Sequence, residues 1–98
     1  MPKQKSEVVD KVVLKYPSRY KVVILNDDYT PMEFVIQLLI EVFNKDLDKA
    51  RQITMAIHEE GSAVAGTYNF EVAEQKVYEA STLARHSNHP LKIDMDEV

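Results

Sequence analysis

The sequence predicts a single small α+β domain, in which a three-stranded sheet is covered on one face by helices. A chain of 98 residues is too short for two independent hydrophobic cores. Short runs rich in β-branched and aromatic residues alternate with longer segments of helical periodicity. The order of these segments, β-α-α-β-α-β, is typical of a sheet packed against helices.

The first 18 residues are predicted to form a flexible N-terminal extension, and the core domain is expected at residues 19–98. Charged residues alternate in this extension with short valine clusters, and no run is long enough to predict an element. A second interpretation stays open, in which the extension becomes a strand or a docking peptide when a partner supplies the other half of the contact.

The first strand is expected at Tyr20–Leu25, where aromatic and β-branched residues indicate burial on most of the surface. A turn follows at Asn26-Asp27-Asp28, because these short polar side chains hydrogen-bond to nearby backbone. Thr30 and Glu33 have the spacing of a capping box, and a proline occupies the first helical position. These signals predict a helix over Pro31–Asn44.

This first helix is apolar over most of its circumference. Its polar residues form one narrow stripe, namely Glu33, Gln37, Glu41 and Asn44. A surface helix usually exposes a wider polar face. The helix is therefore either the central core helix, or part of its apolar surface is reserved for a ligand or partner.

The second half of the chain supplies the remaining elements. Asp46 is expected to cap a helix that Gly61 terminates, and Asn88-His89-Pro90 is expected to end the third helix. Loose alternation with valine and aromatic residues predicts the second strand along the chain. The predicted ranges are Leu47–Glu60 (helix), Ser62–Asn69 (strand), Glu71–Ser87 (helix) and Leu91–Met95 (strand), followed by an acidic end at Asp96–Val98.

Composition and charge exclude several classes of function. The net charge of −4 argues against nucleic acid as a partner, because affinity for it depends on Lys and Arg. Two glycines are too few for a glycine-rich phosphate loop, and the absence of cysteine excludes a disulfide framework and a thiolate metal site. No apolar stretch is long enough for a membrane span, and none follows the first residues as in a signal peptide. We expect a soluble cytoplasmic protein.

Three groups of residues could carry chemistry. Asn26, Asp27 and Asp28 form a turn that could also hold a metal or act as an acid and base, His58 lies near a helix end, and His86 and His89 have the spacing of a weak metal clip. A metal-dependent hydrolase that uses Asp27, Asp28 and His58 would lack further ligands. No nucleophile stands next to a base in a known pattern. A generic interaction domain with an exposed apolar helix is the other alternative.

Four sequence strings resemble the ClpS family of bacterial Clp protease adaptors. They are YKVVILNDDYTPMEF at 20–34, AIHEEG at 56–61, AEQKV at 73–77 and HPL at 89–91, and the similarity extends over 20–95. The resemblance implies a monomeric adaptor, not an enzyme, without cofactor or metal. It would bind proteins whose first residue is Leu, Phe, Tyr or Trp. It would deliver them to the N-terminal domain of the unfoldase ClpA or ClpC for degradation by ClpP.

The resemblance also assigns roles to residues. Asn26, Asp27 and His58 would surround the α-amino group of the substrate, because a terminal ammonium offers three hydrogens. The pocket for the first side chain would be formed by Leu25, Asp28, Thr30, Met32, Val35, Thr54, Ile57 and Leu91. Met32 would disfavour β-branched residues. Glu71 and Lys76 would lie on the surface that docks the unfoldase, and residues 1–18 would be needed for delivery more than for binding.

Two expectations concern the pocket chemistry. Thr54 stands where the family commonly has methionine, so we expect a larger or more polar wall and a preference shifted toward bulky aromatic residues. His58 is expected to accept a hydrogen bond, so affinity should fall as the imidazole becomes protonated.

Overall fold

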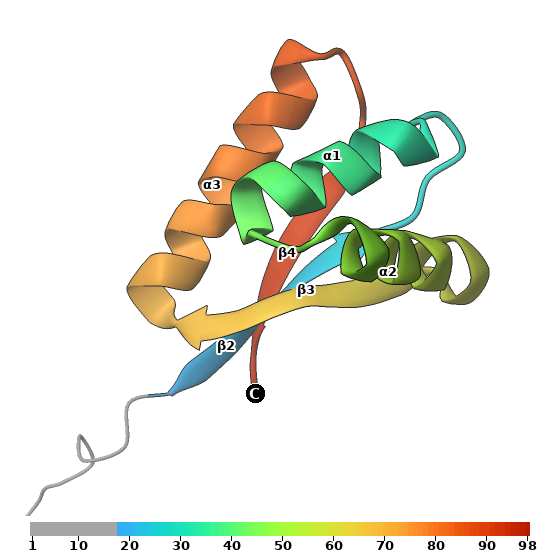
Figure 1. Cartoon of the computed structure of the whole chain (residues 1–98). Helices are drawn as coiled ribbons and strands as arrows, with labels where there is room; N and C mark the ends of the chain where they lie inside the picture. Colours follow the sequence, from blue (N-terminus) through green and yellow to red (C-terminus); the bar gives the residue numbers. More distant parts are fainter. Residues whose placement is uncertain (1–17) are drawn as a thin grey trace, which may run out of the picture.

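The structure, a computed structural model, describes residues 18–98 and confirms the predicted fold class. Three strands form one antiparallel sheet in the order β3-β2-β4, with β2 (Arg19–Leu25) in the centre. The three helices lie on one face of this sheet (Figure 1). Of the predicted N-terminal extension, residues 1–17 lie outside the described residues.

All six predicted elements form, and their ends lie within two residues of the predicted ones. After β2 they are α1 (Met32–Phe43), α2 (Leu47–Glu60), β3 (Ser62–Asn69), α3 (Phe70–His86) and β4 (Lys92–Glu97). The predicted caps of α2 are confirmed: the Asp46 carboxylate accepts from the Lys49 N–H at 2.8 Å, and Gly61 ends the helix with φ 95°.

The capping box predicted for α1 is wrong. Pro31 is the N-cap residue and makes no side-chain cap, and the helix begins at Met32. The Thr30 hydroxyl instead donates to Asp27 Oδ2 at 2.8 Å. The Thr30 N–H, which a capping box would direct to the Glu33 carboxylate, donates to Asp27 Oδ1 at 2.7 Å. Thr30 therefore belongs to the loop before the helix.

The predicted acidic end also needs correction, because most of it belongs to β4. Asp96 and Glu97 pair with Lys21 and Tyr20 of β2. The Ser18 hydroxyl donates to the Glu97 carboxylate at 2.6 Å, and the Val98 N–H donates to the Arg19 carbonyl at 2.8 Å. β4 thus extends as far as the central strand offers hydrogen-bonding partners.

The apolar α1 is the central core helix. Its fully buried Leu38 and Leu39 share the core with Val22 and Ile24 of β2, which are also fully buried. α1 packs against both other helices and against β3. At its first turn, however, Met32 remains 39% exposed. Most of the unusual apolar surface is therefore explained by the core, and one end remains available to a ligand.

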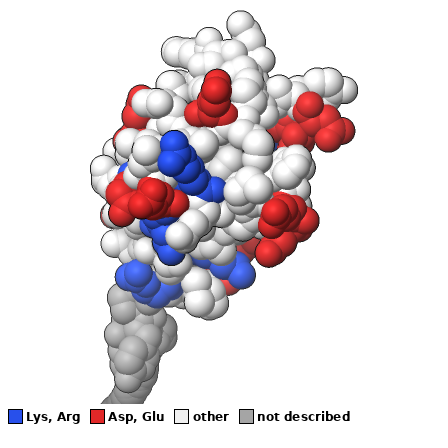
Figure 2. Space-filling model, turned by 45° about the vertical axis from the view of Figure 1, so that its right-hand side comes forward, with Lys and Arg blue, Asp and Glu red and all other residues white. Residues whose placement is uncertain are grey.

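No helix in the described part of the chain is long and apolar enough to cross a membrane. On the face drawn in Figure 2, acidic and basic side chains are interspersed and no broad basic patch forms.

Candidate functional site

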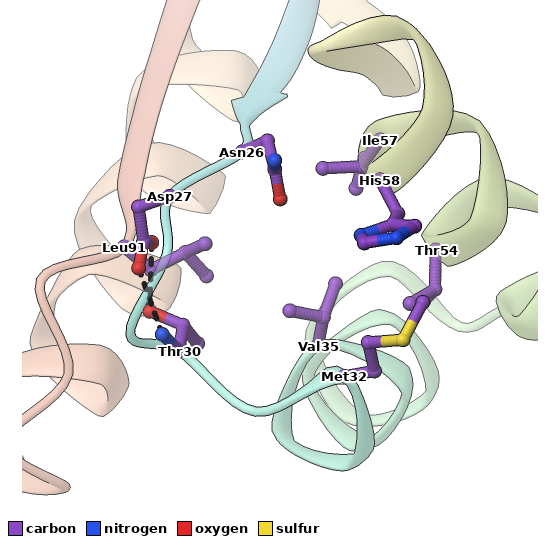
Figure 3. A pocket seen from close by; sticks show the side chains of 9 residues that line it. All are labelled: Asn26, Asp27, Thr30, Met32, Val35, Thr54, Ile57, His58 and Leu91. Carbon is purple, nitrogen blue, oxygen red and sulfur yellow. Dashed lines mark hydrogen bonds between the residues drawn. The ribbon is translucent and has the colours of Figure 1, made fainter.

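A pocket lies where the central strand ends, and four segments of the chain form it. The loop after β2 provides one side and the first turns of α1 the floor. The last turns of α2 provide the facing wall, and the residue before β4 closes the pocket (Figure 3). Nine side chains line it: Asn26, Asp27, Thr30, Met32, Val35, Thr54, Ile57, His58 and Leu91. All nine were selected from the sequence.

The pocket combines a polar mouth with an apolar interior. Asn26 and His58 are exposed to solvent. Val35, Ile57 and Leu91 are buried, with 5%, 3% and 8% of their surface exposed. The empty volume, mouth included, is about 250 Å³. The enclosed part of this space is about 20 Å³, which is room for about one water molecule, so a large side chain can enter only when the lining side chains move apart.

Asp27 organises the loop that forms the mouth. Its Oδ1 accepts from the backbone N–H groups of Tyr29 and Thr30, both at 2.7 Å, while Oδ2 accepts from the Thr30 hydroxyl. This turn places Asn26 on one side of the carboxylate and the start of α1 on the other. Because a carboxylate has about four acceptor positions, Asp27 can accept one more hydrogen bond from a ligand.

The same contacts keep Asp27 ionised. Burial raises the pKa of Asp27. The hydrogen bonds from Thr30 and Tyr29 and the charge of His89 lower the pKa by more than burial raises it, so that it lies below its ordinary value. The sequence offered no sign of this His89 contribution, because 62 positions separate the two residues. The imidazole of His89 also packs edge-on against Phe34, with 4.5 Å between ring centroids.

Two residues predicted for the pocket do not line it. Leu25 is half-buried and Asp28 is exposed. Successive side chains of a strand point to opposite faces. Since Ile24 points into the core, Leu25 points to the other face of the sheet. Asp28 follows Asp27 in the loop, and its side chain is directed to solvent.

Glu71 and Lys76, which were predicted to dock a partner, lie on α3 and do not line the pocket. α3 follows Asn69, which pairs with Arg19 at the start of β2, whereas the pocket lies beyond the end of β2. Glu71 is exposed beside Phe70, whose ring contacts Tyr20 edge-on at 5.2 Å. The Lys76 ammonium donates to the Val42 carbonyl at 2.7 Å. Lys76 therefore also links α3 to the last turn of α1.

The pocket has the groups to hold an ammonium attached to an apolar side chain. Asn26 and His58 lie on opposite sides of the mouth, Asp27 lies next to Asn26 with its carboxylate turned toward Thr30, and apolar side chains line the interior. Within residues 18–98, no three His, Cys, Asp or Glu side chains converge as a metal site would require. This includes Asp27, Asp28 and His58, and also His86 with His89.

Residues 15–94 match the protein family described as ATP-dependent Clp protease adaptor protein ClpS. A ClpS adapter protein of Paraburkholderia xenovorans is 50% identical over 84 residues, which cover 86% of this chain and 81% of the relative. A ClpS adapter protein of Burkholderia mallei is 47% identical over 97 residues, which cover 97% of this chain and 93% of that protein.

A solved structure is similar in both fold and sequence. The structure of Agrobacterium tumefaciens ClpS2 bound to L-phenylalaninamide matches with a TM-score of 0.83 and 40% identity. The match covers 85% of this chain and the whole of that one.

Proposed function

Because this chain belongs to the ClpS family of Clp protease adaptors, which are not enzymes, we propose that its pocket recognises the first residue of substrate proteins. The recognised signal is a free α-amino group that carries a large hydrophobic side chain, namely that of Leu, Phe, Tyr or Trp. The protein would hand such substrates to an unfoldase of the Clp protease.

One observation carries this proposal. Residues selected from distant parts of the sequence converge in one pocket with three acceptors at its mouth and an apolar interior. L-phenylalaninamide, the molecule bound to the A. tumefaciens relative, has the matching chemistry of a free amine joined to a phenyl side chain. The relative's ligand supports the proposal for this chain by analogy of fold and family.

Each polar residue at the mouth has a role in holding the ammonium. The Asn26 side-chain oxygen, the Asp27 carboxylate (directly or through water) and a ring nitrogen of neutral His58 would each accept one of its three hydrogens. Asp27 also supplies the opposite charge. Because Asn26 and His58 are exposed, the rest of the substrate can continue from the carbonyl group of its first residue into solvent.

The interior of the pocket would select the side chain. Burying a Leu or Phe side chain contributes about 1.5–3 kcal/mol, or about 10- to 200-fold in affinity. Met32 lines the pocket from the first turn of α1 and is still partly exposed. We propose that it crowds branched Cβ substituents and thereby disfavours Ile and Val.

Delivery is proposed to require two further parts of the chain. Residues 1–18 would be engaged by ClpA or ClpC, and the surface around Glu71 and Lys76 would dock it. We also propose that the protein acts as a cytoplasmic monomer.

A degradation assay tests this function. A reporter protein that begins with leucine should be degraded by ClpA and ClpP, or by ClpC and ClpP, only when the full chain is added. A variant that lacks residues 1–17 should bind a leucine-starting peptide with unchanged affinity and should no longer support degradation. Degradation at the full rate with this variant would show that the extension has no part in delivery.

Affinity for a leucine-starting peptide should fall as the pH is lowered from 7 to 5.5, because histidine is the side chain that gains a proton in this range. Protonated His58 would donate instead of accept and would repel the ammonium. The pKa of Asp27 lies below its ordinary value, so this carboxylate stays ionised throughout the window and loses its contribution only at lower pH. The substrate amine is already mostly protonated at pH 7.

Two variants locate the titrating group by fluorescence anisotropy. His58→Gln should flatten the pH dependence, because the amide oxygen accepts at every pH. His89→Gln, beside Asp27, is the matched control and should keep it. A pH profile that is flat in the unmodified protein would contradict the role of His58.

A further inference from the structure

The hydroxyl group of Thr54 is buried in the pocket wall without a hydrogen-bond partner. Only 3% of the residue is exposed, and Oγ1 bonds to no other group. Among residues 18–98, only Thr82 has another buried side-chain atom in this state, and Thr82 does not line the pocket. Buried polar groups are nearly always paired in native proteins. The unpaired Thr54 hydroxyl is therefore free to bond to a polar group that a ligand brings into the pocket.

The position of Thr54 fits the far end of a substrate side chain. Thr54 lies on α2 one helical turn before His58, about 6 Å along the helix axis. Both side chains come from the same wall of the pocket (Figure 3). When an amine is held at His58, the first side chain enters the pocket along this wall and its far end reaches the depth of Thr54.

A threonine in a helix has one local alternative, which is to donate to the carbonyl four residues earlier. For Thr54 this is the carbonyl of Ala50, and that bond is not formed. Threonine adopts two χ1 rotamers in helices, and rotation between them exchanges the hydroxyl with the methyl group. The Thr54 hydroxyl can therefore turn toward a polar group that enters the pocket.

The candidate side chains differ in what they offer to this hydroxyl. Leucine and phenylalanine offer no polar group, whereas the phenol of tyrosine both donates and accepts. We infer that Thr54 is a specificity-determining residue, an inference that rests on the proposed function. It favours tyrosine over phenylalanine as the first residue, through a hydrogen bond between Thr54 Oγ1 and the phenol hydroxyl.

A double-mutant cycle tests this inference. Two labelled peptides that differ only in a first Tyr or Phe are titrated by fluorescence anisotropy against the full chain and against Thr54→Val and Thr54→Ser. Valine removes the hydroxyl at almost constant volume, and serine retains it. The preference for tyrosine is the dissociation constant of the Phe peptide divided by that of the Tyr peptide. This ratio should be about 3- to 10-fold larger in the full chain than in Thr54→Val, and Thr54→Ser should keep most of this difference.

The melting temperature of the free variants gives a second readout. Since valine removes an unpaired buried hydroxyl, Thr54→Val should melt about 4–8 °C higher than the unmodified protein. If the hydroxyl donates to the Ala50 carbonyl in solution, Thr54→Val should be as stable as the unmodified protein or less stable. That result would contradict the premise that the hydroxyl is unpaired.

The outcomes separate this inference from the function on which it rests. If both peptides bind and their affinity ratio is the same in Thr54→Val as in the full chain, the selection of tyrosine by Thr54 is refuted while the proposed function stands. If neither peptide binds the full chain, the proposed function falls, and this inference falls with it.

Discussion

A peptide that begins with leucine should bind this protein at least about 100-fold more tightly than the same peptide with an acetylated N-terminus. Acetylation removes the positive charge and leaves only one N–H where an ammonium has three. At least two of the three acceptors on Asn26, Asp27 and His58 then lose their donor. Hydrogen bonds to a charged group contribute about 1.5–3 kcal/mol each, so the loss of two of the three that the ammonium would donate exceeds 100-fold.

The same argument explains why the pocket needs both of its halves. Burial of the leucine side chain alone cannot distinguish a chain terminus from an internal leucine, because the side chain is identical in both. The amine supplies that distinction. Fluorescence anisotropy with the free and acetylated peptides measures it directly, and comparable affinities would show that the mouth residues do not read the terminus.

Asp27→Ala should weaken binding of the leucine-starting peptide at least about 30-fold. This substitution removes the anion beside the ammonium and three hydrogen bonds at 2.7–2.8 Å that hold the loop before α1. Hydrogen bonds to charged groups contribute about 1.5–3 kcal/mol each. Without them, the loop no longer fixes Thr30 and the first turn of α1 around the pocket.

The neighbouring Asp28 provides the matched control. It has the same charge, but it is exposed and does not line the pocket. Asp28→Ala should therefore change affinity by less than about threefold, since salt screens exposed charges. Circular dichroism establishes that both variants are folded at the assay temperature. Equal losses in the two variants would mean that only the net charge of the loop matters.

The fold could be predicted from the sequence because each element carries a local signal. The helix α2 shows this best, since Asp46 and Gly61 mark its ends and both caps form. The start of α1 could not be predicted, because two local patterns compete for the polar groups of Thr30. Thr30 stands three residues before Glu33 and three residues after Asp27. Spacing does not rank these partners, but the carboxylate that also accepts two backbone N–H groups prevails.

The pocket residues could be selected only by resemblance to a family, because Asn26, His58 and Leu91 are distant in the sequence. The details that remained hidden depend on tertiary contacts. His89 acts on Asp27 across 62 positions, and Lys76 reaches the Val42 carbonyl across 34. The unpaired hydroxyl of Thr54 is likewise a property of the packed structure and leaves no sign in the sequence.

The most direct test of the proposed function is a binding series with peptides that differ only in their first residue. Leu, Phe, Tyr and Trp peptides should each bind at least about tenfold more tightly than the Ala, Val and Lys peptides, because only they fill the apolar interior behind the amine. Dissociation constants that agree within about twofold across the whole series would show that the pocket does not read the first residue.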